Sequence, residues 1–206
     1  MSRPLRADAA ANLEKILDAA EAVFDEHGPA VSIELVAKRA GVGLGTVYRR
    51  FADKQALLSA LVERLLVQAV EVADRHAGTP DGLVTYLFEV GALLARHSGS
   101  VARMWSDEQV ADLVERSRTT QAALVAQARQ HGVVRSDLTP EDVAVALWSL
   151  GGVLDITRGT TVDAWRRHLE LVVAGWTNTA AHLGHPPLTD AQMREVIRHS
   201  PSAAQR

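Results

Sequence analysis

The chain has 206 residues, a net charge of −3 at pH 7 and no cysteine. This length is enough for one or two domains with a hydrophobic core, and the 47% hydrophobic content is ordinary for a globular protein. The lack of cysteine excludes disulfide bonds, thiolate metal sites and cysteine nucleophiles. No apolar run approaches about 18 residues and the N-terminus has no signal-peptide pattern, so we expect no membrane span and a cytoplasmic location.

Apolar residues recur at helical spacing along most of the chain, and Gly and Pro separate the resulting segments. In the first part of the chain this pattern predicts helices at about residues 9–27, 33–40, 44–51 and 54–75. Ser32 and Asp53 stand where caps of the second and fourth helices are expected. The short stretch Gly41-Val42-Gly43 predicts a tight turn between the second and third helices.

The second part of the chain begins with a predicted linker at residues 76–82, which contain two Gly and one Pro. Further helices are predicted at about residues 82–97, 100–106, 107–130, 140–156, 162–183 and 189–199. Pro140 followed by two acidic residues is typical of a helix start. The β-branched residues fall inside helical stripes rather than in alternating runs, so no strand is predicted and the expected fold class is all-α.

Positive charge is concentrated in one short segment of this mildly acidic chain. From Lys38 to Lys54 there are five basic residues and one acidic residue. Such a local cluster fits a DNA-binding module attached to a neutral body. A cluster of this size is also compatible with an ordinary solvated surface. The sequence motif that contains it is therefore needed to distinguish a DNA-binding surface from a solvated one.

Residues 32–51 follow the order helix, glycine turn, helix, which is that of a helix-turn-helix. In this motif the second helix enters the major groove of DNA and the first crosses the backbone. Val42, Val47 and Phe51 are predicted to fill the interior of the unit. The outward face of the second helix then offers small, hydroxyl, phenol and guanidinium groups that suit DNA contacts: Leu44, Gly45, Thr46, Tyr48, Arg49 and Arg50.

This stretch resembles the DNA-binding domain of the TetR family of helix-turn-helix transcriptional regulators. The positions that carry the resemblance are Ser32, Val36, Ala37, Ala40, Gly41, Val42, Gly43, Gly45, Thr46, Val47, Tyr48, Phe51, Asp53, Lys54 and Leu57. The resemblance covers about residues 9–60, and residues 129–143 also look like this family. It implies a DNA-binding domain at 1–53, a connecting helix and linker at 54–79, and a helical ligand-binding and dimerisation domain at 80–206.

Carried over position by position, the resemblance assigns phosphate contacts to Ser32, Thr46, Tyr48 and Lys54. It assigns base edges to Leu44, Gly45 and Arg50, and either role to Arg49. Two departures from the family pattern matter: Gly43 stands where Ser usually caps the recognition helix, and Arg50 replaces a common His or Tyr. For Tyr48, a place in the core remains an alternative.

The resemblance also implies a second copy and a ligand in the C-terminal part. The helices near 140–156 and 162–183 are expected to pair with their copies in a dimer through Leu147, Leu150, Gly151, His168, Val172, Gly175 and Trp176. A ligand pocket is expected to be lined by Tyr86, Val90, Leu94, Met104, Trp105, Trp148 and Asp155. The alternative for both sets is an ordinary intramolecular core, with Asp155 paired to Arg158.

Other functional classes find little support in the sequence. There is no GxSxG, P-loop or HExxH motif, and the eight His residues show no metal-ligand spacing. We therefore expect no enzyme activity, no cofactor and no metal. The expected function is that of a ligand-released repressor that binds a palindromic operator as a homodimer and responds to a hydrophobic effector. The alternatives are a regulator with no effector, or an activator.

Overall fold

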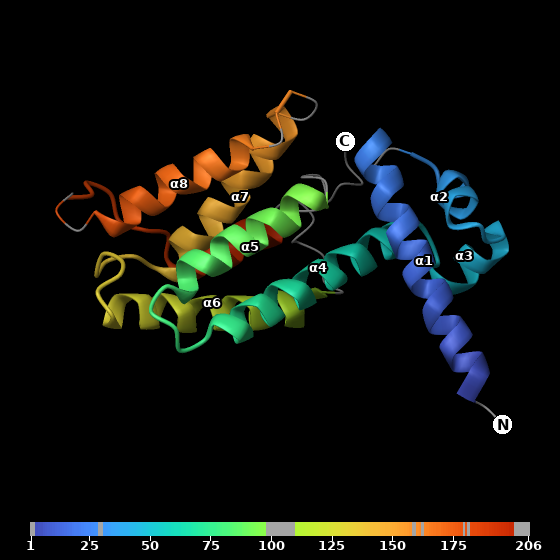
Figure 1. Cartoon of the computed structure of the whole chain (residues 1–206), viewed down its shortest axis with the longest axis horizontal. Helices are drawn as coiled ribbons and strands as arrows, with labels where there is room; N and C mark the ends of the chain where they lie inside the picture. The colour runs from blue at the N-terminus through green and yellow to red at the C-terminus, as the bar shows by residue number, and fades with distance from the viewer. Residues whose placement is uncertain are drawn as a thin grey trace.

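The computed structural model describes residues 3–28, 31–97, 110–157, 160–161, 163–178, 180 and 182–199. The described residues form nine α-helices and contain no strand, which confirms the predicted all-helical fold (Figure 1). The helix predicted at 100–106 and the start of the one predicted at 107 lie outside the described residues. Among the described helices, none is both long enough and apolar enough to cross a membrane.

The helices form a small N-terminal unit joined to a larger body (Figure 1). The unit consists of α1 (Arg3–His27), α2 (Ile33–Ala40) and α3 (Leu44–Arg50). Helix α4 (Lys54–His76) runs from the unit into the body. The body is completed by α5 (Gly82–Arg96), α6 (Ala111–Gln130), α7 (Pro140–Thr157), α8 (Ala164–Thr177) and α9 (Asp190–His199).

Two predicted helix boundaries differ by about six residues: α1 begins at Arg3 rather than near residue 9, and α8 ends at Thr177 rather than near residue 183. The carbonyl oxygen of Trp176 accepts a hydrogen bond of 2.8 Å from the backbone N–H of Arg135, in the loop between α6 and α7. The Asn178 side-chain oxygen accepts the backbone N–H of Ala180 at 3.2 Å. These two hydrogen bonds replace the next helical turn of α8. The bond from Arg135 comes from a distant loop, so the residue pattern along α8 alone does not predict it.

A continuous apolar core connects the N-terminal unit to the body. Phe24 of α1, Val36 of α2, Val47 of α3 and Leu57 of α4 are all buried and belong to this core. It continues along the length of α4, whose buried residues contact both α5 and α6. The position of the unit on the body is therefore set largely by apolar packing around α4.

Helix α8 lies close to α5 because α5 carries Gly91 at the contact. A Cβ atom on Gly91 would lie 2.7 Å from Cζ3 of Trp165 and 2.8 Å from Cδ1 of Leu169. Both partners are buried side chains of α8, and such short contacts would force the two helices apart. The glycine thus allows the α5–α8 packing that closes this side of the body.

Candidate nucleic-acid interface

The turn between α2 and α3 contains two glycines with different backbone conformations. Gly41 ends α2 in the left-handed region, with φ of 66°, and its N–H points to the carbonyl oxygens of Ala37 and Lys38. Gly43 precedes α3 with φ of −68°, an extended conformation open to any residue, and offers no side-chain cap. Only the first of these positions requires glycine on conformational grounds.

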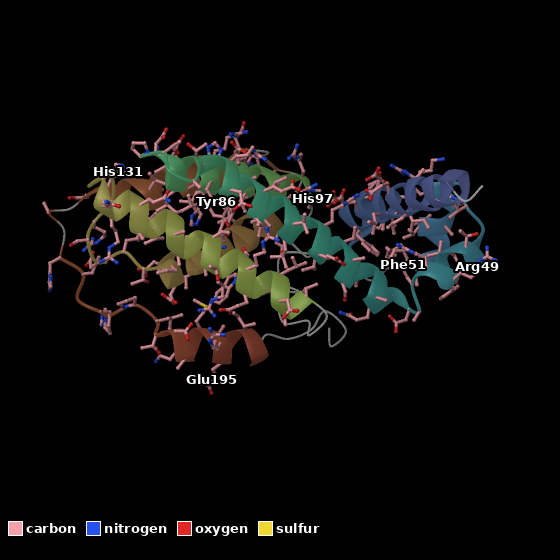
Figure 2. All side chains as sticks on the ribbon, turned by 90° about the horizontal axis from the view of Figure 1, so that it is seen from below. Arg49, Phe51, Tyr86, His97, His131 and Glu195 are labelled. Carbon is pink, nitrogen blue, oxygen red and sulfur yellow. The ribbon has the colours of Figure 1, made fainter. Side chains whose placement is uncertain are left out.

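The inner side of α3 is fixed by apolar packing. Val47 is fully buried and Phe51, directly after the helix, is buried as predicted. In Figure 2, Phe51 lies toward the inside of the unit, and Arg49 lies at its outer end. Tyr48 is 46% exposed. The alternative that placed Tyr48 in the core is therefore wrong, and its phenol is available at the surface.

The outer side of α3 carries the residues that the sequence assigned to DNA. Arg49 donates a hydrogen bond from Nη2 to Oγ1 of Thr46 at 3.0 Å, so these two side chains are held together in the absence of DNA. The residues on this side that are exposed are Leu44, Gly45, Tyr48, Arg49 and Arg50, and Thr46 is half-buried. The structure therefore brings six of the eight predicted DNA contacts onto one short helix.

The other two predicted contacts flank this helix on neighbouring elements. Ser32 precedes α2 but makes no side-chain capping bond. Instead, the Glu34 carboxylate is hydrogen-bonded by its own backbone N–H and by the Ser32 hydroxyl, which lowers the pKa of Glu34. Lys54 begins α4 and is half-buried, and this burial lowers the pKa of its amine. Asp53 caps the same helix, accepting the Ala56 N–H at 2.8 Å.

One of the basic residues counted in the sequence has a partner within the unit. Arg39 of α2 donates from Nη2 to Oε1 of Glu26 on α1 at 2.8 Å. This pair ties the two helices together at the surface. The basic cluster is thus divided between packing of the unit and the outer face of α3.

A cluster of charged residues that the sequence reasoning missed joins the unit to the body. Arg64 of α4 lies among three carboxylates of α1, with nitrogen–oxygen distances of 3.5 Å to Glu14, 2.7 Å to Asp18 and 2.6 Å to Glu21. A sequence signal for this cluster exists, because acidic residues at positions i, i+4 and i+7 share one face of a helix. What the sequence does not show is that a single arginine, 46 positions after Asp18, meets that face.

Glu21 also contacts Nδ1 of His97, the residue that directly follows α5. Burial alone would raise the pKa of Glu21, but hydrogen bonds and charge from His97 and Arg64 outweigh it and hold this pKa below its ordinary value. Glu21 therefore connects α1, α4 and the end of α5 through one carboxylate. Figure 2 shows His97 near the place where the unit meets the body.

The predicted pocket residues are divided among different places in the body. Tyr86, Val90 and Leu94 of α5 are buried in the core. The hydroxyl of Tyr86 accepts a hydrogen bond of 3.0 Å from Nε2 of Gln121. Trp148 of α7 lines a cavity whose other walls come from α6 and α9. Asp155 is half-buried near the end of α7, and Met104 and Trp105 lie outside the described residues.

The residues predicted for a dimer interface are also divided. Leu147, Leu150 and Gly151 are buried within the chain itself, so they are not available to contact a second copy directly. His168, Val172 and Trp176 are half-buried, and Gly175 is exposed. Within the part of the chain that the structure describes, no group of three or more His, Asp or Glu residues is arranged to hold a metal ion.

The sequence of the N-terminal unit is similar to those of known proteins. Residues 16–61 match the model of a family described as bacterial regulatory proteins, tetR family. An HTH-type transcriptional regulator of Staphylococcus aureus (strain USA300) is 39% identical over 61 residues, which make up 29% of this chain and 33% of that protein. The match thus spans about a third of the length of this curated relative.

Solved structures resemble the chain over most of its length. A TetR transcription regulatory protein from Mycobacterium vanbaalenii is 28% identical, with a TM-score of 0.58 over 84% of this chain and 99% of the other. A TetR transcriptional regulator from Streptomyces coelicolor is 25% identical, with a TM-score of 0.59 over 80% of this chain and 97% of the other. The outer face of α3, the family model and these structures agree: residues 16–61 match the helix-turn-helix domain of the TetR family, and the chain as a whole is similar in fold to TetR transcriptional regulators.

Proposed function

We propose that this protein binds a palindromic DNA operator as a homodimer and acts as a repressor that a small molecule releases. The observation that carries the DNA-binding part is α3: its inner side is anchored by buried Val47, and its outer side presents Thr46, Tyr48, Arg49 and Arg50. A helix that is packed on its inner side and carries hydroxyl and guanidinium groups on its outer side can bind phosphates and contact base edges in the major groove.

Within this proposal, Ser32, Thr46, Tyr48 and Lys54 hold phosphates, and Leu44, Gly45 and Arg50 meet base edges. Arg49 has either role. The domain division that goes with it is a DNA-binding part at 1–53, a connection at 54–79 and a regulatory body at 80–206. Since such a regulator acts where bacterial DNA lies, the expected location is the cytoplasm.

The dimer part of the proposal rests on an apolar face of α7 and α8. Ile156 is 85% exposed and Leu171 is 58% exposed, and Val145 also lies at the surface. On α7, residues 145, 149, 152 and 156 share one side of the helix, and on α8 residues 168, 171 and 175 do the same. The two sides are joined by a hydrogen bond of 2.9 Å between Ser149 Oγ and His168 Nε2. Exposed apolar groups beside Gly152 and Gly175 suit close packing of helices from a second copy.

Release by an effector requires a route from the body to the DNA-binding unit. A ligand shifts the protein only through a difference in its affinity for two arrangements. The route that we propose is α4 together with the Glu21 carboxylate, because Glu21 contacts His97 at the end of α5 and Arg64 on α4. A displacement of α5 or α6 against α4 would then tilt α1 and, with it, α3.

The test of this proposal is selection of bound DNA from a random pool with the full-length protein. We expect an enriched two-fold symmetric sequence whose half-sites are centred one helical turn, about 34–36 Å, or a multiple of it apart. Failure to enrich any sequence would refute DNA recognition, and an asymmetric single site would refute the dimer. Transcription from a promoter that carries the selected site then separates repression from activation, and adding candidate compounds separates a regulator with an effector from one without.

A further inference from the structure

A small cavity lies between α6, α7 and the C-terminal helix α9. Its apolar walls are formed by Val114 of α6, Leu147 and Trp148 of α7, and Met193 and Ile197 of α9. Its free volume is about 20 Å³, which is enough for about one water molecule. A pocket for a drug-sized molecule needs about 300–1,000 Å³. In the conformation of this structure, the cavity is therefore too small for such a molecule, and α9 covers one side of it.

The cover is attached weakly compared with the rest of the body. Met193 is 1% exposed and is the buried apolar contact of α9. Ile197 adds a half-buried apolar contact. Ion pairs also link α9 to α6: Asp190 with Arg118 at 2.5 Å, and Arg194 with Glu115 at 3.1 Å. Figure 2 shows Glu195 on α9 at the edge of the molecule, beside α6. The α9 partners, Asp190 and Arg194, are exposed, and ion pairs made by exposed groups contribute little, so α9 can open without unfolding of the core.

Two buried, uncharged polar side chains, Ser117 and Gln121, lie among the mostly apolar residues that line the cavity. Gln121 donates from Nε2 to Oη of Tyr86 at 3.0 Å and to Oγ of Ser117 at 3.2 Å, and all three side chains are buried. Gln121 and Ser117 line the cavity. An amide and a hydroxyl can each donate and accept hydrogen bonds, so this group can exchange an internal partner for a ligand atom.

No net charge favours an ionic ligand at this place. Burial raises the pKa of Tyr86 to about 12, so its phenol stays neutral. Arg118, at the rim, keeps Glu141 as a partner at 3.5 Å even when the Asp190 contact with α9 is broken. An ion that entered would lose its hydration without gaining an opposite charge, which is costly.

We propose that the space beneath α9 binds an uncharged, mostly apolar small molecule with one hydroxyl or carbonyl group, which enters when α9 opens and hydrogen-bonds to Gln121 and Ser117. This site shares Trp148 with the pocket that the sequence suggested, but Val90 and Leu94 do not line it. That binding at this site affects DNA release rests on the proposed function. The physical connection would be α6, which lines the cavity and also contacts α4. A molecule that lifts Val114 and Gln121 would press α6 against the helix that leads to the DNA-binding unit.

The opening of α9 can be tested by thiol labelling, because the natural chain has no cysteine. Met193→Cys places one thiol on the covered side of α9, and Leu169→Cys places one in the core of the body, where Leu169 is fully buried. In the full-length protein, we expect the thiol of Met193→Cys to react at least about tenfold faster than the thiol of Leu169→Cys, because local opening needs less free energy than global unfolding. Equal, slow rates for both variants would overturn the proposal.

The ligand class can be tested by calorimetry with 4-hexylphenol, hexylbenzene and 4-hexylbenzoate, without DNA. We expect 4-hexylphenol to bind about tenfold more tightly than hexylbenzene, as one hydrogen bond allows, and the benzoate to bind most weakly. Gln121→Leu should remove the preference for the phenol, and the matched control Gln130→Leu, at an exposed position of the same helix, should keep it. No binding of any probe, or an unchanged preference in Gln121→Leu, would overturn the site. If the cavity results hold but the protein selects no DNA, the proposed function fails and the binding site remains.

Discussion

The two glycines on either side of Val42 differ in what their backbone requires. Gly41 has φ of 66°, where a side chain is strained, and Gly43 has φ of −68°, where a side chain is free of strain. A Cβ on Gly43 would find Oγ1 of Thr46 at 3.9 Å, and a Cβ on Gly41 would find nothing within 4 Å. Space is therefore available at both positions, and only the backbone conformation separates them.

The same substitution at these two glycines should have opposite effects on stability. We expect Gly41→Ser to destabilise the protein by about 1 kcal/mol through left-handed strain. We expect Gly43→Ser to stabilise it by a few tenths of a kcal/mol by supplying the missing cap of α3. Urea unfolding of both variants beside the natural protein measures the difference. Equal signs would show that the turn does not keep the conformation described here.

Arg50 and Lys54 should separate base readout from phosphate contact. Lys54→Ala should weaken binding to all DNA sequences equally and lower the slope of log affinity against log salt by about 0.9, one counterion. Arg50→Ala should instead cost about 1–3 kcal/mol at one base pair and relax the preference there. Titration of the selected operator and its single-base variants at several salt concentrations checks both. If the two variants behave alike, the assigned roles are wrong.

At the level of elements, the charged contacts of Glu21 connect three helices that are distant in sequence. Glu21 on α1 receives Arg64 from α4 at 2.6 Å and contacts His97 after α5. The side chain of Arg64 is only 16% exposed, so this group is less screened than a surface ion pair. Removal of the carboxylate would leave a half-buried guanidinium with its weaker partners, Glu14 and Asp18.

The stability of this junction should depend on pH in a defined direction. Because the pKa of Glu21 is lowered in the folded protein, its carboxylate stabilises the fold above the ordinary glutamate pKa, and this contribution is lost as pH falls through the folded-state value. We expect Glu21→Gln to reduce the free energy of unfolding by about 1–2 kcal/mol at neutral pH. The difference from the natural protein should shrink as pH falls below the ordinary glutamate range.

Chemical denaturation at a series of pH values measures this effect, with Glu63→Gln at an exposed position of α4 as the control. The control should follow the natural protein at every pH. A Glu21→Gln difference that stays constant between neutral and acid pH would show that the carboxylate charge does not hold the junction.

For the whole molecule, the apolar face of α7 and α8 decides the expected assembly. We expect Leu171→Arg to convert a dimer into a monomer at about micromolar concentration, because it puts a charge in the centre of the proposed face. Glu170→Arg introduces the same side chain at the preceding position, which is exposed but turned away from that face. We expect this variant to remain dimeric. Sedimentation velocity distinguishes the two. A monomeric natural protein at tens of micromolar would contradict the dimer directly.

A mutation at Leu150 would not provide this test, although the sequence pattern points to it. Leu150 is fully buried within the chain, so Leu150→Arg would damage the core before it affected an interface. The periodicity of α7 identifies which residues are apolar, but one helix has more than one apolar side. Which side packs inside and which faces a second copy depends on where α5 and α8 lie.

The sequence by itself determined the helices of the N-terminal unit apart from the start of α1, together with its glycine turn and the outer face of α3. These features depend on contacts within about twenty residues, so local spacing and turn chemistry are sufficient to predict them. The tertiary structure alone decided the early end of α8, the meeting of Glu21 with Arg64 and His97, and the cover that α9 places over Ser117 and Gln121. Each of these joins residues from elements far apart in the chain, and their pairing follows from how the helices pack around α4, which no local pattern records.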